Sequence, residues 1–489
     1  MPATALRGTR TVPNTAAAPS TRADLSAGAL AAGLTVLCLV HSWALLNALR
    51  FVGFDLGIFT QAVRSYAETG VPTSRIKGDP IHLGTMNLLG DHFHPIIAVI
   101  APLYRLFPTA YTLLAVQAVL IGLSVFQVGR YAARRLGGPA GPVVGACHGL
   151  SYGVLAAVGF EFHEVAFAVP LLAGALIAVL DGRERAAVLW SAPLVLVKED
   201  LGLTVAAIGV ALVLRRRSRS GAALIAGGVL ATWLTMTVVV PALNSGTYAY
   251  TGAADGGGPL PSLLGLPACL VDDPVKRHTL LLMLLGCGIV GLRSPVAVVA
   301  LPTVLWRLTA AKEAYWGTAH HYDLLLMPVL VLALVDGAGR TLERGTPRTL
   351  RQRRAVAVAA VALCAGTMAA SLPAARLGED PALLRAGPDA SSAAALRLAR
   401  RIPDGGSVAT RAKLAPVLVP RCAVWLLGNG STRIAGGRTP GTEWILTDRN
   451  MSLARAFTDA ERDAVLSRWE HHGLRVVAQD HGWFLLHRV

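Results

Sequence analysis

The stretch RERAAVLWSAPLVLVKEDLGLTVAAIGVALVLRRR, from Arg183 to Arg217, has arginines at both ends and the charged tip Lys198–Asp200 in its middle. Arginines in short loops beside apolar segments are typical of the cytoplasmic side of a membrane. Both ends therefore belong on that side, and the chain must turn back at Lys198. Each arm has about 12–14 residues, or roughly 20 Å of helix, whereas the hydrocarbon core is roughly 30 Å thick. We expect the tip to lie low, where charges are costly unless they line a wet cavity or a site.

The same alternation runs through the whole apolar part of the chain. Clusters of acidic residues and histidines alternate with clusters of arginines, and apolar runs separate the two kinds. The first kind comprises FDLGIF (54–59), GDHFHP (90–95), FHE (162–164), KED (198–200) and HHYD (320–323), and the second comprises Arg130 with Arg134 and Arg135, Arg183 with Arg185, Arg215–Arg217 with Arg219, and Arg340 through Arg354. This alternation predicts a polytopic membrane protein whose acidic residues and histidines all lie on one side of the membrane.

The composition agrees with a membrane protein. The 489 residues are 53% hydrophobic and only 15% charged, and the mean hydropathy is +0.52. A soluble protein of this size needs more charge to stay in solution. The formal net charge of +16 is explained by arginines in short cytoplasmic loops, so we expect membrane lipids and no nucleic acid as partners. The excess of arginine over lysine is typical of a GC-rich, actinobacteria-like genome.

We predict an all-α polytopic membrane protein with about 11 transmembrane helices and a small extracytoplasmic α/β domain at the carboxyl end. The expected domains are a disordered cytoplasmic tail (1–24), a transmembrane domain (25–373) with an outer loop (51–93), and the outer α/β domain (374–489). This places the chain in a bacterial plasma membrane, with the amino terminus inside and the carboxyl-terminal domain outside. Within the outer loop, residues 55–67 have the spacing of an amphipathic helix.

The ionisable clusters supply the candidate site. Each cluster also has a purely structural interpretation. Asp55 suits the first turn of a helix, and the histidine clusters suit polar loop tips. Lysine and arginine near the interface can extend their charged ends into water. Carboxylates and imidazoles together offer ligands for Mn²⁺, Mg²⁺ or Zn²⁺, and lysine and arginine suit phosphate oxygens. Candidate catalytic residues are Asp55 and Asp91; candidate metal ligands are His92, His94, His163 and Glu164; candidate phosphate-binding residues are Lys198, Arg307, Lys312, His320 and His321; and Glu199, Asp200 and Tyr322 are expected to support them.

Five strings carry a resemblance to a known family: FDLGIFTQAV (54–63), GDHFHPIIAVIAPLYRLFP (90–108), FHEVAF (162–167), LVKEDLGL (196–203) and HYDLLLMPVLV (321–331). In this order they resemble DUF2079, a family of bacterial membrane proteins. That family is more distantly similar to membrane glycosyltransferases of the GT-C fold.

The resemblance implies a GT-C-like transmembrane domain that moves a sugar from a polyprenyl-phosphate carrier to an acceptor outside the cytoplasm, with inversion at the anomeric carbon. It implies a carboxylate after the first span, which Asp55 matches, and in some members a divalent metal held by outer-loop residues. The chain lacks a clear DxD pair and the oligosaccharyltransferase acceptor motif. Two other functions stay open at this point. One is a lipid or solute transporter, or flippase, and the other is a non-catalytic envelope protein whose outer domain binds a partner.

Overall fold

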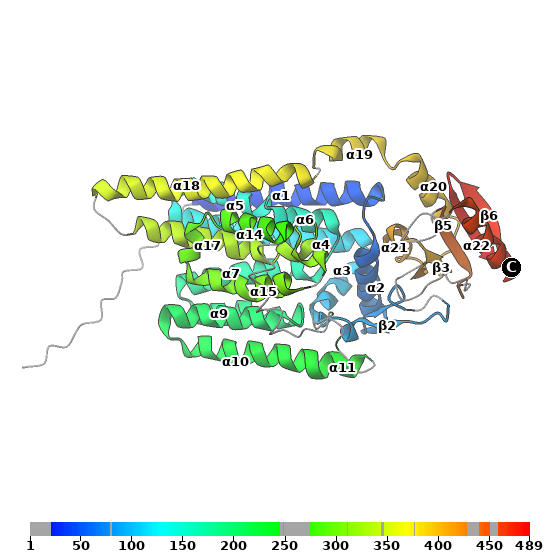
Figure 1. Ribbon diagram of the computed structural model, residues 1–489, viewed down its shortest axis with the longest axis horizontal. Helices are drawn as coiled ribbons and strands as arrows, with labels where there is room; N and C mark the ends of the chain where they lie inside the picture. The colour runs from blue at the N-terminus through cyan, green and yellow to red at the C-terminus, as the bar shows by residue number, and fades with distance from the viewer. Residues whose placement is uncertain are drawn as a thin grey trace, which may run out of the picture.

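The computed structural model describes residues 21–78, 81–244, 248, 273–310, 312–343, 347–375, 377–427, 440–449 and 458–489. Most of the amino-terminal tail expected at 1–24 lies outside these residues. The bundle helices run side by side along the long axis of the molecule, and a small mixed domain lies at one end (Figure 1). The mostly helical bundle and the small carboxyl-terminal sheet confirm the expected fold class.

The bundle is built from helices of very different lengths. They are α1 (Thr21–Asn47), α4 (Ala110–Leu136), α5 (Ala140–Gly149), α6 (Tyr152–Phe160), α7 (Ala168–Asp181), α8 (Glu184–Ser191), α9 (Leu201–Arg216), α10 (Arg219–Leu234), α11 (Val240–Leu243), α14 (Pro274–Gly286), α15 (Leu301–Thr309), α17 (Leu326–Leu342) and α18 (Pro347–Ser371). The elements α2 (Phe54–Thr69), α3 (Ala101–Leu106) and α16 (Glu313–Trp316) lie between them in the chain.

Six helical stretches among the described residues are long and apolar enough to cross a membrane. They are Thr21–Asn47, Ala110–Leu136, Glu164–Asp181, Arg219–Leu243, His321–Leu342 and Thr349–Ala375. A seventh would be the pair α5 and α6, if the two helices, which are bent by 41° at a short break, form one span. The apolar segments Pro95–Leu106 and Pro295–Thr309 are shorter. The count of about 11 therefore stays a prediction, because several expected spans are short helices.

Burial separates the central helices from the peripheral ones. The apolar windows of the stretches containing α7 and α17 are 89% and 94% buried inside the protein, whereas those containing α10 and α18 are 28% and 22% buried. Helices that are apolar all round and buried on every side form the centre of a bundle. The exposed apolar faces of α10 and α18 are therefore the surfaces that we expect to meet lipid.

The expected hairpin around Lys198 is present. The arm α8 continues into a 3₁₀ turn, Ala192–Leu196, and α9 returns from Leu201. Helices α9 and α10 then pack closely through glycines: a Cβ on Gly228 would lie 2.2 Å from the carbonyl oxygen of Gly202. Small residues at such contacts let helix backbones approach each other within a membrane.

The carboxyl-terminal domain, called the outer domain from here on after its expected location, is a small unit of helices and strands, as predicted. Its elements are α19 (Asp380–Ala386), α20 (Ala390–Ala399), β3 (Ser407–Thr410), α21 (Ala415–Leu418), β4 (Ala423–Leu426), β5 (Trp444–Asp448), α22 (Asp459–His471), β6 (Leu474–Asp480) and β7 (Trp483–Arg488). The sheet has the order β4-β3-β5-β7-β6, in which β3 pairs in parallel with β4 and β5. The β5–β7 and β7–β6 pairs are antiparallel.

Helix α2 joins the bundle to this domain. The residues predicted to share one face, Leu56, Phe59 and Val63, are all buried. The amide of Gln61 donates to the carbonyl of Val424 at 2.8 Å, and Arg64 donates to two carbonyls at the end of α21 and before β4. Since α2 packs against both parts of the molecule, the outer domain fixes the position of the helix that carries Asp55.

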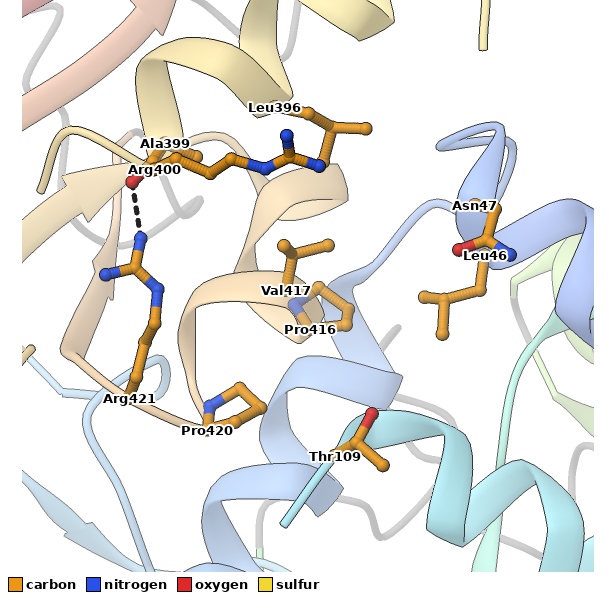
Figure 2. Close-up of a pocket in the computed structure, with 10 residues that line it drawn as sticks. All are labelled: Leu46, Asn47, Thr109, Leu396, Ala399, Arg400, Pro416, Val417, Pro420 and Arg421. Atoms are coloured by element: carbon orange, nitrogen blue, oxygen red, sulfur yellow. Dashed lines mark hydrogen bonds between the residues drawn. The ribbon is translucent and has the colours of Figure 1, made fainter. Parts of the chain in front are cut away.

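A cavity of about 290 Å³ lies on the other side of this junction. Figure 2 shows Leu46 and Asn47 from the end of α1 facing Val417 and Pro420 of the outer domain across it. Arg421 donates to the carbonyl of Ala399 and so ties α20 to the segment before β4. The strands β1 (Thr73–Ser74) and β2 (Met86–Asn87) form a short antiparallel pair in the first outer loop.

Candidate functional site

The start of helix α2 is held by a carboxylate from a distant turn. Gly53 precedes the helix with φ +83°, and its backbone N–H donates to Glu161. The N–H of Leu56 donates to the other oxygen of Glu161 at 2.5 Å. The first N–H groups of a helix lack partners within the helix, so Glu161 acts as an N-cap supplied by another segment. This arrangement fixes Asp55, which lies between the two bonded residues.

Glu161 is the functional residue that sequence reasoning missed. It is fully buried, and this burial, with a smaller contribution from the charge of Asp55, raises its pKa to about 7 against the opposing hydrogen bonds from α2. In the sequence, the one sign of its importance is its position beside His163 and Glu164, in the tight turn at 160–164. Only the distant contact with Gly53 shows why a carboxylate is needed there.

Asp55 and His163, predicted independently, form a direct pair. The Nε2 atom of His163 lies 3.3 Å from Oδ2 of Asp55, and the side chains are 6% and 29% exposed, respectively. Burial raises the pKa of Asp55, but the hydrogen bond to His163 and the positive charges of His163, Lys77 and Lys198 outweigh it and hold the pKa below its usual value. Asp55 is therefore an ionised carboxylate that still reaches solvent.

The hairpin tip supplies a cation beside this pair. Nζ of Lys198 lies 3.4 Å from Oε1 of the buried Glu164. Burial lowers the pKa of Lys198, but Glu164, Asp200 and Glu199 more than offset this and raise it above its usual value. Lys198 is therefore a permanent positive charge at the site.

Oδ1 of Asp200 is buried and accepts no hydrogen bond from any described residue.

The cluster of residues 91–94 is divided among separate contacts. His92 Nδ1 lies 2.6 Å from Glu199, which also accepts from the Phe93 N–H and the Tyr248 hydroxyl. Asp91 lies 2.9 Å from Nζ of Lys77. The charge of Lys77 also acts on Asp55, so this lysine, which the sequence did not single out, links Asp91 to the Asp55 neighbourhood.

Several imidazoles gather beside the Asp55–His163 pair. The rings of His163 and His321 stack with centroids 3.4 Å apart, and Tyr322 lies 4.2 Å from His321. Phe160 contacts His163 and His320. The Nδ1 atoms of His163, His320 and His321 are buried and unpaired within the described part of the chain. This surface can exchange protons and can accept a ligand that hydrogen-bonds the free nitrogens.

His94 has a different environment. It is buried, and its ring contacts Phe59 edge-on with centroids 5.5 Å apart. Burial lowers its pKa, so the ring is neutral. Its Nδ1 atom is unpaired among the residues that the structure describes.

Two of the predicted phosphate ligands have other partners. The guanidinium of Arg307 pairs with both oxygens of Asp323, at 2.6 and 3.1 Å, and both side chains are buried. It also donates to the carbonyls of Tyr315 and Gly317. Lys312 is exposed and lies over the ring of Tyr315. All three guanidinium nitrogens of Arg307 donate to protein oxygens, so the contacts of this residue are those of a structural ion pair.

The described residues hold no group of three or more His, Cys, Asp or Glu side chains arranged to ligate one metal ion. Of the predicted ligands, His92 pairs with Glu199, His163 with Asp55, and Glu164 with Lys198. As placed, the described side chains do not form a set of ligands for a metal ion.

Comparison with known proteins places the chain in a family. Two crystal structures of ArnT from Cupriavidus metallidurans, one bound to undecaprenyl phosphate and one in the apo state, are similar to it with TM-scores of 0.47 and 0.45 and identities of 15% and 13%. Both alignments cover 94% of this chain, and they cover 98% and 97% of the ArnT chains. No curated protein matches the chain. The family profile described as "Predicted membrane protein (DUF2079)" matches residues 45–482, so the chain belongs to the DUF2079 family.

Proposed function

We propose that this protein is a membrane glycosyltransferase that moves a sugar from a polyprenyl-phosphate carrier to an acceptor hydroxyl outside the cytoplasm, with inversion. The observation that carries the proposal is the Asp55–His163 pair. An ionised, partly exposed carboxylate is hydrogen-bonded to a buried imidazole, and two lysines act on it electrostatically. Removing a proton beside a departing phosphate needs this combination of a base and cations.

In the proposed reaction, Asp55 orients the acceptor hydroxyl and takes its proton. The acceptor oxygen forms a bond to the anomeric carbon as the bond from that carbon to the phosphate oxygen breaks. The electron pair leaves with the phosphate, and the positive charges of Lys198 and Lys77 stabilise the negative charge that builds up there. His163 holds Asp55 and can receive the proton afterwards, so its role is positioning and proton transfer.

The low hairpin tip supports a lipid-linked donor. The two arms of the hairpin, α8 with its 3₁₀ extension and α9, are short, and Lys198 is largely buried between them, at 18% exposure. A phosphate on a membrane-embedded chain can reach a lysine at this depth, whereas a free sugar nucleotide stays in the aqueous phase. The resemblance to GT-C glycosyltransferases supports the same donor class.

The decisive experiment is turnover by the purified full-length protein in detergent. Polyprenyl-phosphate pentoses and hexoses would be incubated with it, and release of polyprenyl phosphate would be followed by mass spectrometry. We expect release with the wild type and loss of at least 100-fold with Asp55→Asn. Absence of turnover with every donor, together with transport of the same lipids or of solutes in proteoliposomes, would overturn the proposal in favour of a transporter.

A further inference from the structure

A second polar region lies behind the Asp55 site, within a cavity of about 740 Å³. Helices α1, α6, α14, α18 and α19 contribute to its walls. Most of the lining is apolar, and its aliphatic part includes Leu45, Leu155, Ala156, Leu282, Leu285 and Ala374. A cavity of this size with such walls can enclose part of a hydrocarbon chain.

Two buried polar groups line the same cavity without partners. His41 is 2% exposed, and its Nδ1 atom lies 2.8 and 2.9 Å from the two carboxylate oxygens of Asp380. Nε2 of His41 has no hydrogen-bond partner among the described residues, and neither has the hydroxyl of Tyr152, which is 6% exposed. A buried polar group without a partner costs about 1–3 kcal/mol. Such groups facing a cavity indicate a ligand.

Asp380 determines how His41 can bind that ligand. Because Nδ1 donates its proton to the carboxylate, Nε2 is left facing the cavity, near Gly159. In the neutral ring Nε2 accepts a hydrogen bond, and in the imidazolium it donates one. A singly protonated phosphate monoester offers both an O–H and charged oxygens, so it can satisfy either form.

An arginine and a histidine continue the lining to the surface. Arg50 and His278 both line the cavity and are exposed. Neither side chain makes a hydrogen bond or ion pair with any residue within the described ranges. Glu379 is the acidic residue on the lining, and it is exposed as well. The cavity therefore passes from apolar helix sides, past Nε2 of His41 and the hydroxyl of Tyr152, to an arginine at the surface.

We propose that this cavity binds a lipid with a phosphate head. The hydrocarbon chain lies against the apolar walls, and the phosphate lies between Arg50 and His278 within reach of His41. This site is distinct from the one at Lys198. Gly159 and Ala319 line the cavity, and the residues that follow them, Phe160 and His320, contact each other with centroids 4.8 Å apart and face the Asp55 site. The inference concerns binding, so it holds whether or not the protein transfers a sugar.

The test measures lipid binding to the full-length protein in detergent by native mass spectrometry. Two probes distinguish the sources of a phosphate head: farnesyl phosphate, an isoprenoid monoester, and a short-chain phosphatidylglycerol, a bulk-membrane diester. We expect Arg50→Gln to weaken binding at least 10-fold. Ala374→Phe, which fills part of the cavity from an exposed lining position, should do the same.

Control substitutions lie on two of the helices that wall the cavity, away from its lining. Arg354→Gln, near the opposite end of α18, and Val36→Phe, on the exposed face of α1, should leave both affinities unchanged. If the variants lose affinity for farnesyl phosphate alone, the cavity is a site for a phosphate monoester. If they lose affinity equally for both probes, it is a site for bulk phospholipid. Unchanged affinities for both probes in both Arg50→Gln and Ala374→Phe would overturn the proposal. Asp55→Asn should bind both lipids normally, which separates this site from the proposed reaction.

Discussion

His163 Nε2 lies 3.3 Å from Asp55 Oδ2, although the two residues are more than a hundred positions apart in the chain. The contact joins the first outer loop to the turn after α6. It converts two isolated candidates into a pair in which an imidazole restrains a carboxylate. The predictions below test this pair and the structure that holds it.

Replacing Asp55 removes the proposed base while preserving the size of the side chain. We expect Asp55→Asn to lower the rate of sugar transfer at least 100-fold, because an amide cannot take the acceptor proton. The thermal midpoint should change little, since the side chain is partly exposed. Asp404→Asn, an exposed carboxylate of the outer domain, is the matched control and should transfer at the wild-type rate. Equal activity of the two variants would contradict the assignment.

Lys198→Met should weaken binding of the lipid donor more than it slows turnover. The side chain keeps its apolar length, but the charge facing the phosphate is lost, and the buried Glu164 loses its partner. We expect the KM for the donor to rise about 10-fold or more. The double variant Lys198→Met/Glu164→Gln should recover stability without recovering affinity. Lys312→Met, at an exposed lysine, serves as the comparison, and a similar rise in its KM would argue against a specific role for Lys198.

Glu161 makes the stability of the protein depend on pH in a predictable direction. The folded protein keeps the Glu161 proton up to a pKa of about 7, whereas the unfolded chain releases it near 4.5. Between these values only the folded state binds the proton, so stability falls as the pH rises through this window. Across this window the free energy of unfolding should fall by on the order of 3 kcal/mol, at 1.36 kcal/mol per pKa unit.

Thermal midpoints of wild type and Glu161→Gln, measured between about pH 4.5 and pH 8, check this dependence. The variant has no titrating group at this position, so its midpoint should decline less with rising pH than that of the wild type. Its helix α2 loses one of two cap acceptors, so it should also be less stable at low pH. Parallel curves for the two proteins would show that Glu161 keeps its ordinary pKa.

Gly53→Ala and Gly70→Ala form a matched pair at the two ends of α2. Both glycines have positive φ, +83° and +78°, which L-residues rarely adopt. A Cβ on Gly53 would lie 2.2 Å from the carbonyl oxygen of Ala412 in the outer domain, whereas one on Gly70 would meet open space. We expect Gly70→Ala to cost about 1 kcal/mol and Gly53→Ala at least twice that. Only Gly53→Ala should also reduce the rate of sugar transfer, because the added methyl group displaces Asp55.

Arg307→Gln tests whether this residue is structural. Its removal leaves Asp323 as a buried charge without a partner, which costs about 3–5 kcal/mol. We therefore expect a large fall in the thermal midpoint, partly restored in Arg307→Gln/Asp323→Asn. Once the protein is stabilised at low temperature, the KM for the donor should be normal. A raised KM with an unchanged midpoint would restore Arg307 to the phosphate site.

The sequence by itself determined the class of protein and the local elements. Long apolar runs and flanking arginines predict a helical bundle, because hydropathy and loop charge act over a few residues. Helix α2 follows from the spacing of residues 55–67, and the structure confirms both this helix and the small α/β domain at the carboxyl end. The 41° bend between α5 and α6 could not be predicted in this way, because hydropathy along the chain does not record how helices pack.

The tertiary structure alone decided which charged groups meet. Asp55 and His163 were both recognisable candidates, but nothing local to either residue joins them. Glu161, Lys77, and the His41–Asp380 pair were not identifiable, because each takes its meaning from a partner far away in the chain. Arg307 is the opposite case. Its residue type suits a phosphate ligand, but in the folded protein it is paired with Asp323. Residue type sets what a side chain can bind, and only the fold determines which partner it has.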